Sequence, residues 1–309
     1  MRRRDRIVAE PILKDEDRRV RITEVGPRDG LQNESAKVTV EDKIRLIDAL
    51  SQAGFPEIET SSFVSPKWVP QLADAGEVFA GIDRRPGTLY SALVPNERGL
   101  ERALASGVDK LAVFTAASES FCDRNLNTTI KGSIERFRPV FEAARRASLP
   151  VRGYVSCVVR CPFEGAIDPA RVGETVTRLL EAADGRIEIA LGETLGVATP
   201  EDIQRLLAGV GGIVPMGELD LHLHDTNGRA VDCAARALDL GVRRFDASCA
   251  GLGGCPYAPG AAGNLATEDL LRMLDRDGWS TGIDSDKVLV AARIAAEITG
   301  RSVVDPGTD

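Results

Sequence analysis

Residues 40–60 read VEDKIRLIDALSQAGFPEIET, which predicts an amphipathic helix followed by a short strand. Ile44, Ile47 and Leu50 recur at helical spacing, so one face of this helix is apolar and the opposite face is charged. Gly54 ends the helix, because glycine tolerates the left-handed conformation found just after many helices. The last four residues of the stretch are typical of a strand. Together they form one helix-and-strand unit of an α/β protein.

The same alternation of strand and helix recurs about eight times along the chain. The expected strands are Val20–Val25, Glu57–Thr60, Thr88–Leu93, Lys110–Thr115, Val151–Val155, Arg186–Ala190, Leu219–Leu223 and Arg243–Ala247. The expected helices are Val40–Ala53, Asn96–Ser106, Thr129–Ser148, Asp168–Ala183, Pro200–Val210, Arg229–Leu240, Leu265–Asp277 and Ser285–Thr299. No linker rich in glycine, proline or serine divides this alternation, which therefore predicts a parallel sheet closed into a (β/α)8 TIM barrel.

A doubly wound open sheet is the alternative architecture, but no Gly-x-Gly-x-x-Gly motif follows the first strand, where a dinucleotide-binding fold needs it. The helix Ser285–Thr299 has no strand before it, and we expect this extra C-terminal helix to cap the barrel. Residues 1–18 begin with an arginine-rich run and continue with acidic residues, without an apolar segment, so we expect a solvated tail rather than a targeting peptide. Residues 19–309 then form a single domain.

Composition excludes several classes of protein. Hydrophobic residues make up 43% of the 309 and charged residues 28%, which is enough for a large core and excludes wholesale disorder. The 39 Lys and Arg against 47 Asp and Glu argue against a nucleic-acid partner. No apolar run reaches the roughly 18–20 residues that span a bilayer, so we expect no membrane association. Six cysteines are too few for a disulfide framework, and we expect a cytoplasmic protein with reduced thiols.

The only two histidines, His222 and His224, lie two residues apart at the end of a predicted strand. Their side chains leave the same face of that strand, with Cα atoms roughly 6.5–7 Å apart. In a barrel, Asp29 at the end of the first strand would meet them, and two imidazoles with one carboxylate form a metal site. A lone histidine is more often an ordinary hydrogen-bonded residue, but both histidines sharing one strand face favours the metal site. Mixed nitrogen and oxygen ligands suit Mg²⁺ or Mn²⁺, while Fe²⁺ and Zn²⁺ remain open on ligand type.

Other candidate site residues follow the predicted strands. Arg28 lies between Gly26-Pro27 and Gly30, where a permanently charged guanidinium would stabilise an enolate or oxyanion. Cys255 lies in a glycine-rich loop, which suits a mobile thiol that exchanges protons. Glu59 and Glu193 stand at strand ends and either act as a base or orient neighbouring groups. We expect the other cysteines to be small buried residues.

Five stretches of the chain resemble the 3-hydroxy-3-methylglutaryl-CoA (HMG-CoA) lyases, a family of metal-dependent TIM-barrel lyases. They are Glu24–Glu34 (EVGPRDGLQNE), Glu59–Gln71 (ETSSFVSPKWVPQ), Arg152–Cys157 (RGYVSC), His222–Thr226 (HLHDT) and Gly251–Asp269 (GLGGCPYAPGAAGNLATED). These stretches are distributed over about residues 20 to 275, nearly the whole chain, and the first and last are long enough to be specific to the lyases.

The resemblance implies a role for each matching residue. The divalent metal ligands would be Asp29, His222, His224 and Asn264. Arg28 would be the enolate-stabilising cation, Cys255 the catalytic thiol, and Glu59 and Glu193 acidic residues of the active site. We also expect Arg28, Gln32 and Arg152 to bind the substrate. The implied reaction is the retro-Claisen cleavage of HMG-CoA to acetyl-CoA and acetoacetate, as in leucine and ketone-body metabolism, with Mg²⁺ or Mn²⁺ as the cofactor.

Three residues depart from the family pattern. Glu193 replaces an aspartate that the family usually has, and the extra methylene moves the carboxylate by roughly 1–1.5 Å, a misplacement that can cost about 10²-fold in rate. Asn227 replaces a frequent tyrosine, and Cys249 replaces a valine. These changes raise the hypothesis that the pocket prefers a relative of HMG-CoA, such as citramalyl-CoA or a longer 3-hydroxy-3-alkylglutaryl-CoA.

Other functions stay open on sequence grounds. A Claisen-condensing synthase shares the metal motif but usually carries an additional regulatory domain. A biotin-dependent carboxyltransferase is another barrel relative and needs a lysine in the barrel mouth, for which Lys67 and Lys110 are poorly placed. A non-enzymatic alternative is an inactive scaffold that binds acyl-CoA and metal. We expect an acyl-CoA thioester as the partner and a homo-oligomer, dimeric or larger.

Overall fold

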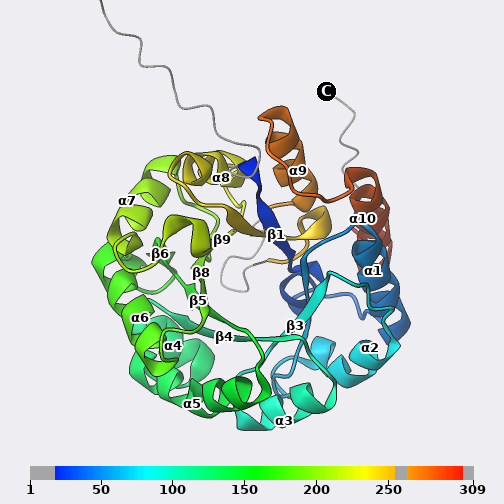
Figure 1. Cartoon of the computed structure of the whole chain (residues 1–309), viewed down its shortest axis with the longest axis horizontal. Coiled ribbons are helices and arrows are strands. Elements are labelled where there is room, and N and C mark those ends of the chain that lie inside the picture. Colours follow the sequence, from blue (N-terminus) through cyan, green and yellow to red (C-terminus); the bar gives the residue numbers. More distant parts are fainter. Residues whose placement is uncertain (1–17, 255–262, 302–309) are drawn as a thin grey trace, which may run out of the picture.

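Eight parallel strands close into a barrel in the computed structural model, which describes residues 18–254 and 263–301 (Figure 1). The strands are β1 (Arg21–Glu24), β2 (Glu57–Ser62), β3 (Leu89–Leu93), β4 (Lys110–Ala116), β5 (Val151–Ser156), β8 (Glu188–Glu193), β9 (Leu219–Leu223) and β10 (Arg244–Ala247). Strand β1 pairs with β10 on one side and with β2 on the other, which closes the sheet. The predicted (β/α)8 barrel is confirmed, and the open doubly wound sheet is wrong.

Helices form a ring outside the barrel (Figure 1). They are α1 (Val40–Gln52), α2 (Ala75–Gly81), α3 (Glu97–Ala105), α4 (Glu119–Leu126), α5 (Ile130–Ala147), α6 (Pro169–Ala182), α7 (Pro200–Val210), α8 (Ala230–Asp239), α9 (Thr267–Arg276) and α10 (Ser285–Thr299). The predicted helices agree with these bounds to within two residues at each end. Helices α2 and α4 were not predicted, because seven or eight residues give too few turns for a periodic pattern.

Shorter elements lie between the main ones. A π-helical turn, η2 (Gly26–Gly30), follows β1, and a two-stranded antiparallel hairpin joins β6 (Arg160–Cys161) to β7 (Gly165–Ala166). The 3-10 turns are η3 (Pro70–Leu72), η4 (Met216–Glu218) and η5 (Cys249–Gly251). Helix α10 packs beside α1 and η5 and closes the ring of helices between α9 and α1 (Figure 1).

Helix α1 shows how local sequence sets the element bounds. The side chain of Thr39 accepts a hydrogen bond from the backbone N–H of Asp42, at 3.2 Å, and so caps the first turn. Leu46, Ile47 and Leu50 are fully buried against the barrel. Gly54 has a φ of 87°, which an L-residue adopts only with strain, so the glycine ends this segment and turns the chain towards β2.

The strands carry apolar residues on the face towards the helices and polar residues on the face towards the barrel axis. In β9, whose residues are all buried, Leu219, Leu221 and Leu223 belong to the hydrophobic core. Asp220 and His222 alternate with them and meet side chains of other strands inside the barrel. The interior therefore holds many polar and charged side chains beside a small apolar cluster of Leu93, Ala112, Tyr154 and Ala190. The site lies at the carboxyl ends of the strands.

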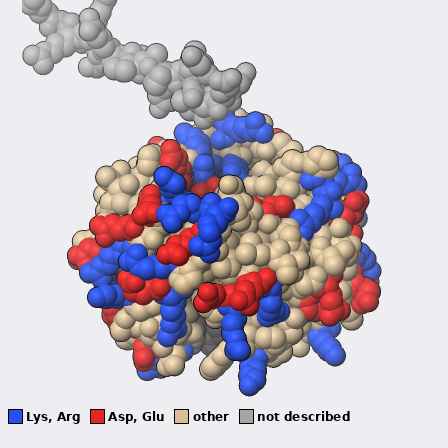
Figure 2. All heavy atoms as spheres, turned by 60° about the horizontal axis from the view of Figure 1, so that its bottom comes forward, with Lys and Arg blue, Asp and Glu red and all other residues tan. Residues whose placement is uncertain are grey.

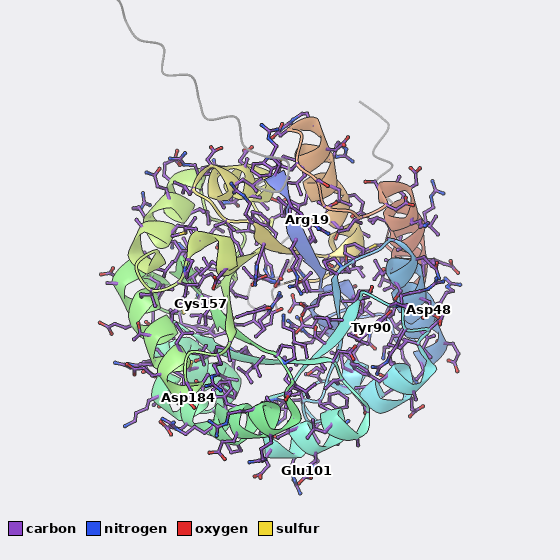
Figure 3. The ribbon with its side chains drawn as sticks, in the orientation of Figure 1. Arg19, Asp48, Tyr90, Glu101, Cys157 and Asp184 are labelled. Atoms are coloured by element: carbon purple, nitrogen blue, oxygen red, sulfur yellow. The ribbon has the colours of Figure 1, made fainter. Side chains whose placement is uncertain are left out.

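On the outer surface, charged side chains of both signs lie close to one another. On the face in Figure 2, Lys and Arg alternate with Asp and Glu over most of the view. Figure 3 shows Glu101 of α3 pointing away from the ring of helices, whereas Cys157 lies inside it. Within residues 18–254 and 263–301, no helix is long and apolar enough to cross a membrane.

Candidate metal centre and active-site cavity

The turn η2 places Arg28 and Asp29 at the carboxyl end of β1. Three consecutive amides, those of Arg28, Asp29 and Gly30, donate hydrogen bonds to the carbonyl of Val25, at 2.8 to 3.2 Å. A Cβ atom on Gly26 would lie 2.6 Å from Oε1 of Glu24, so only glycine fits where the turn begins. Single π-helical turns are frequent at functional sites, because they change the direction of neighbouring side chains.

Asp29, His222 and His224 each contribute one ligand atom to a group whose atoms all lie within 4.8 Å of one another. The Nε2 atoms of His222 and His224 are 3.3 Å apart. Oδ2 of Asp29 lies 3.8 Å from Nε2 of His222 and 3.9 Å from Nε2 of His224. Burial acts to raise the pKa of Asp29, but Arg28 and the two histidines outweigh it and hold the pKa well below its usual range. Asp29 is therefore an ionised carboxylate next to two imidazoles.

Asn264 completes this group from the segment after β10. Its Nδ2 donates to Oδ2 of Asp29 and to the carbonyl of Leu252, both at 3.0 Å, and its backbone pairs with that of His224. Its Oδ1 is buried and has no hydrogen-bond partner. A buried amide oxygen without a partner is costly unless a ligand satisfies it. The donor set of two nitrogens and two oxygens therefore fits a divalent cation.

Arg28 is held by two carboxylates. Its Nε donates to Oε2 of Glu59 at 2.7 Å, its Nη2 lies 2.6 Å from the same oxygen, and its Nη1 donates to Oδ1 of Asp29 at 2.5 Å. The guanidinium also lies over the ring of Tyr154, 5.6 Å from its centre. Burial disfavours the charged form of Arg28, but the two carboxylates outweigh this and raise its pKa. Arg28 therefore stays charged within the site.

Glu193 ends β8 and is 1% exposed. Neither of its carboxylate oxygens makes a hydrogen bond within the usual limits, and burial raises its pKa. The nearby His224 side chain and the backbone amides of residues 195–197 act in the opposite direction. Glu193 thus lies beside the metal-ligand group but takes no part in its hydrogen bonds.

A cavity of about 170 Å³ opens at this end of the barrel, and Arg28, Asp29 and the two histidines line it, whereas Glu59, Glu193 and Asn264 lie behind its walls. Its walls are formed by Arg28, Asp29, Gln32, Asn33, Leu93, Phe114, Phe121, Asn125, Tyr154, Ser156, Gly192, Thr194, His222, His224 and Gly254. Gln32, expected to bind substrate, therefore lies at the cavity. Three apolar side chains lie opposite the polar ones and give the cavity an apolar side.

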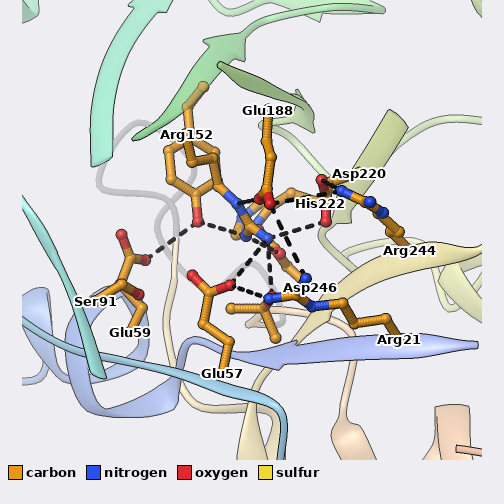
Figure 4. Close-up of polar contacts among 12 residues, drawn as sticks. Arg21, Glu57, Glu59, Ser91, Arg152, Glu188, Asp220, His222, Arg244 and Asp246 are labelled. Carbon is orange, nitrogen blue, oxygen red and sulfur yellow. Dashed lines mark hydrogen bonds and ion pairs between the residues drawn. The ribbon is translucent and has the colours of Figure 1, made fainter. Parts of the chain in front are cut away.

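Arg152, also expected to bind substrate, is not brought to the cavity. Its side chain is 1% exposed and lies deeper in the barrel, where it contacts acidic residues of other strands (Figure 4). Its Nη1 donates to Oδ1 of Asp246 at 2.7 Å, and its Nη2 donates to Oδ1 of Asp220 at 2.9 Å. The reason is its register on β5, where it stands one inward position before Tyr154, the residue that does line the cavity.

The other predicted residues divide into two groups. Cys255 lies outside the described residues. Cys249 is buried, Asn227 is exposed, and none of the three departures from the family pattern lines the cavity. Glu193 is the departure that lies beside a metal-ligand residue, His224. Cys122, Cys157, Cys161, Cys233 and Cys249 are all buried, as expected for the structural cysteines.

Tyr154 and Asp246 are two of the site residues that were not predicted. Tyr154 lines the cavity, and Asp246 accepts a hydrogen bond from His222, with 3.1 Å between Nδ1 and Oδ2. Both are polar residues at inward positions of their strands. The alternation of inward and outward positions along a strand is visible in the sequence and could have identified these two residues. It could not have identified the residues that they contact across the barrel.

Comparison with known proteins agrees with this geometry. The HMGL-like family model matches residues 19–294. The chain is 50% identical over 285 residues to the 3-hydroxy-3-isohexenylglutaryl-CoA/hydroxy-methylglutaryl-CoA lyase of Pseudomonas aeruginosa, covering 92% of this chain and 94% of the relative. It is 52% identical over 271 residues to the mitochondrial hydroxymethylglutaryl-CoA lyase of Gallus gallus, covering 88% of this chain and 90% of the relative.

A solved structure gives the same result. An HMG-CoA lyase from Acinetobacter baumannii, in complex with coenzyme A and 3-methylmalate, superimposes with a TM-score of 0.88 at 36% identity. The match covers 95% of this chain and 97% of that one. The chain therefore belongs to the HMGL-like family, that of the HMG-CoA lyases.

Proposed function

We propose that this protein is a carbon–carbon lyase that cleaves HMG-CoA to acetyl-CoA and acetoacetate in the presence of a divalent cation. The observation that carries this proposal is the joint position of two imidazoles, a carboxylate and the charged Arg28 in one cavity, with an unsatisfied amide oxygen on the neighbouring Asn264. The relatives named as HMG-CoA lyases supply the substrate class.

Asp29, His222, His224 and Asn264 would hold the ion, with Mg²⁺ or Mn²⁺ best suited to these ligands. When bound, such an ion supplies a positive charge that lowers the pKa of the tertiary hydroxyl of the substrate. The neighbouring Arg28 keeps Asp29 ionised. The amide nitrogen of Asn264 donates a hydrogen bond to Asp29, so the amide oxygen of Asn264 is available to the ion.

Arg28 and Glu193 have complementary tasks in the cleavage. Glu193 takes the hydroxyl proton, because it is buried beside His224 and burial raises its pKa. The C–C bond then breaks, which releases acetoacetate as a ketone and leaves the enolate of the acetyl thioester. Arg28, held by Glu59 and Asp29, stabilises the negative charge of that enolate.

Cys255 is our choice for the final proton donor to the α-carbon of the enolate, which completes acetyl-CoA. This assignment depends on its place in the matched stretch Gly251–Asp269, since the residue lies outside the described part of the chain. Gln32 lines the cavity, which supports its role in substrate binding.

Release of acetyl-CoA tests the proposal. Purified protein is incubated with HMG-CoA and with Mg²⁺, Mn²⁺ or EDTA, and acetyl-CoA and acetoacetate are quantified by liquid chromatography. We expect equimolar products with either ion and none with EDTA. Tight binding of HMG-CoA without products would favour the inactive scaffold. Net condensation of the two products under the same conditions would favour the synthase.

A second candidate substrate is a 3-hydroxy-3-alkylglutaryl-CoA with a longer alkyl group, or citramalyl-CoA. The apolar side of the cavity, formed by Leu93, Phe114 and Phe121, supports room for an alkyl group, and the Pseudomonas aeruginosa relative is named for an isohexenyl substrate. Comparing kcat/KM for these thioesters with that for HMG-CoA decides the matter. Equal or faster cleavage of HMG-CoA would refute this preference.

We also propose a cytoplasmic homo-oligomer. Free thiols at Cys122, Cys161, Cys233 and Cys249 support a reducing compartment. Trp68, 84% exposed, supports an interface, because surface tryptophans are enriched where subunits meet. Light scattering coupled to size-exclusion chromatography gives the mass in solution. A monomer at micromolar concentration would contradict the oligomer.

A further inference from the structure

Arg152 occupies the centre of the barrel, one layer below the cavity. Figure 4 shows it between acidic side chains of other strands: Glu57, Glu188, Asp220 and Asp246. Its Nη2 donates to Oγ1 of Thr23 at 2.9 Å as well as to Asp220. With 1% of its side chain exposed and both terminal nitrogens bonded, the guanidinium has no freedom to turn.

From Nη1 one chain of contacts leads to the metal-ligand group. Arg152 donates to Oδ1 of Asp246, and Oδ2 of Asp246 lies 3.1 Å from Nδ1 of His222. An ionised carboxylate at Nδ1 selects the tautomer with the proton on that nitrogen, which leaves the Nε2 lone pair free for a metal ion. Arg152 thereby sets the position of the carboxylate that orients His222.

A second chain of contacts leads from the same nitrogen to Arg28. Nη1 of Arg152 also donates to the hydroxyl of Tyr154, at 3.3 Å, and that hydroxyl donates to Oε2 of Glu59, at 3.3 Å. The same Oε2 accepts the bond from Nε of Arg28. These contacts link Arg152 to the charged group on the other side of the cavity.

We propose that Arg152 is a positioning residue that holds both halves of the active site, His222 through Asp246 and Arg28 through Tyr154 and Glu59. Arg152 touches neither the cavity nor a ligand atom, so its effect passes entirely through these neighbours. The proposal rests on the proposed metal-dependent lyase activity. The wild-type protein tests that activity by Mn²⁺ binding and acetyl-CoA release, whereas the variants below test the role of Arg152.

Asp246→Asn interrupts the contact to His222 while keeping the shape of the side chain. The amide nitrogen donates to Nδ1 and selects the other tautomer, so we expect Mn²⁺ affinity of the metal-free protein to fall about 10- to 100-fold by isothermal titration calorimetry. Unchanged affinity in a folded variant would overturn this half of the proposal.

Tyr154→Phe interrupts the contact to Glu59 and keeps the ring beneath Arg28. We expect Mn²⁺ affinity within about twofold of the wild type, kcat lower by about 10-fold and KM nearly unchanged, because Arg28 is displaced only slightly. A loss of metal affinity, or a kcat equal to that of the wild type, would overturn this half.

Arg152→Lys keeps the charge but offers one nitrogen in place of a fork, so we expect both defects together: weaker Mn²⁺ binding and lower kcat. Thr23→Val is the matched control, because it removes one bond of Arg152 outside both chains of contacts. We expect it to lower the melting temperature without changing Mn²⁺ affinity.

A purely structural role for Arg152 predicts a different pattern. Metal affinity and kcat would then follow the melting temperature in all four variants, Thr23→Val included. If Asp246→Asn fails to fold, Tyr154→Phe and Arg152→Lys still distinguish a positioning role from a purely structural one. A positioning role predicts that Tyr154→Phe lowers kcat without weakening Mn²⁺ binding, whereas Arg152→Lys lowers both.

Discussion

The carboxylate of Glu24 accepts a hydrogen bond from the backbone N–H of Cys249, at 2.9 Å, and so joins two segments that lie 225 residues apart. The same oxygen accepts from the N–H of Gly26, at 2.8 Å, and the other oxygen accepts from Thr267 Oγ1, at 2.7 Å. Glu24 therefore ties the turn that carries Arg28 to the segment that leads to Asn264. Burial raises the pKa of Glu24 to about 8, despite these bonds.

This pKa predicts a dependence of stability on pH. Between about 4.5, where Glu24 titrates in the unfolded chain, and about 8, the folded protein keeps a proton that the unfolded chain has lost. The free energy of unfolding therefore falls as the pH rises through this window, by roughly 3–5 kcal/mol, and levels off above it.

Glu24→Gln should remove this contribution. The amide keeps the hydrogen bonds without a titrating proton, so the variant should match the wild type at pH 5 and exceed its stability at pH 9. Urea unfolding at pH 5, 7 and 9 measures the difference. Glu101→Gln, at an exposed position of α3, is the control and should follow the wild-type curve. If the stability of Glu24→Gln changed with pH in parallel with that of the wild type, the raised pKa would not belong to Glu24.

Mn²⁺ should stabilise the folded protein. An ion that binds only the folded state adds about 2.7 kcal/mol when its concentration is 100 times Kd, which raises the melting temperature by a few degrees. His224→Ala removes one ligand and should abolish most of this increase. Differential scanning calorimetry with Mn²⁺ and with EDTA gives the comparison. An equal increase in the variant would place the ion elsewhere.

Arg28→Lys should lower kcat by about 10²-fold or more and change KM much less. Lysine keeps the charge, but one ammonium group does not reproduce the contacts of Nε, Nη1 and Nη2 with Glu59 and Asp29. Steady-state kinetics with HMG-CoA measures both constants. If KM rises instead at constant kcat, Arg28 serves ground-state binding only.

Glu193→Asp should increase the ratio of kcat/KM for HMG-CoA to that for a longer 3-hydroxy-3-alkylglutaryl-CoA. The shorter side chain moves the carboxylate by roughly 1–1.5 Å within a buried site, which is enough to change which substrate it fits. Both thioesters are assayed with the same enzyme preparation. An unchanged ratio would show that Glu193 does not set substrate preference.

Cys255→Ala should lower kcat by at least about 10²-fold and change KM little, because a proton donor acts after the substrate has bound. Cys233→Ala is the control: burial raises the pKa of this thiol to about 12, so it is inert, and its loss should reduce stability only. Cys255→Ala turning over at the wild-type rate would exclude the thiol as the donor.

Much of the fold could be predicted from the period of the apolar residues. The spacing of Ile47 and Leu50 predicts a helix with one buried face. Because such helices alternate with strands along the chain, the sequence also predicts a barrel. The short helices α2 and α4 could not be predicted, because seven or eight residues carry too few repeats. The turn η2 was read only as a strand end, because its π-helical form depends on contacts with Glu24 and Leu252.

The sequence by itself determined the candidate metal site, because His222 and His224 share a strand face and Asp29 stands at the end of another strand. Only the tertiary structure decided the place of Arg152. Its partners Asp220 and Asp246 lie 68 and 94 residues away along the chain. Closing the sheet puts these strands in one ring, and the register between them sets which inward side chains share a layer. That register is a property of the whole barrel, so no local pattern reports it.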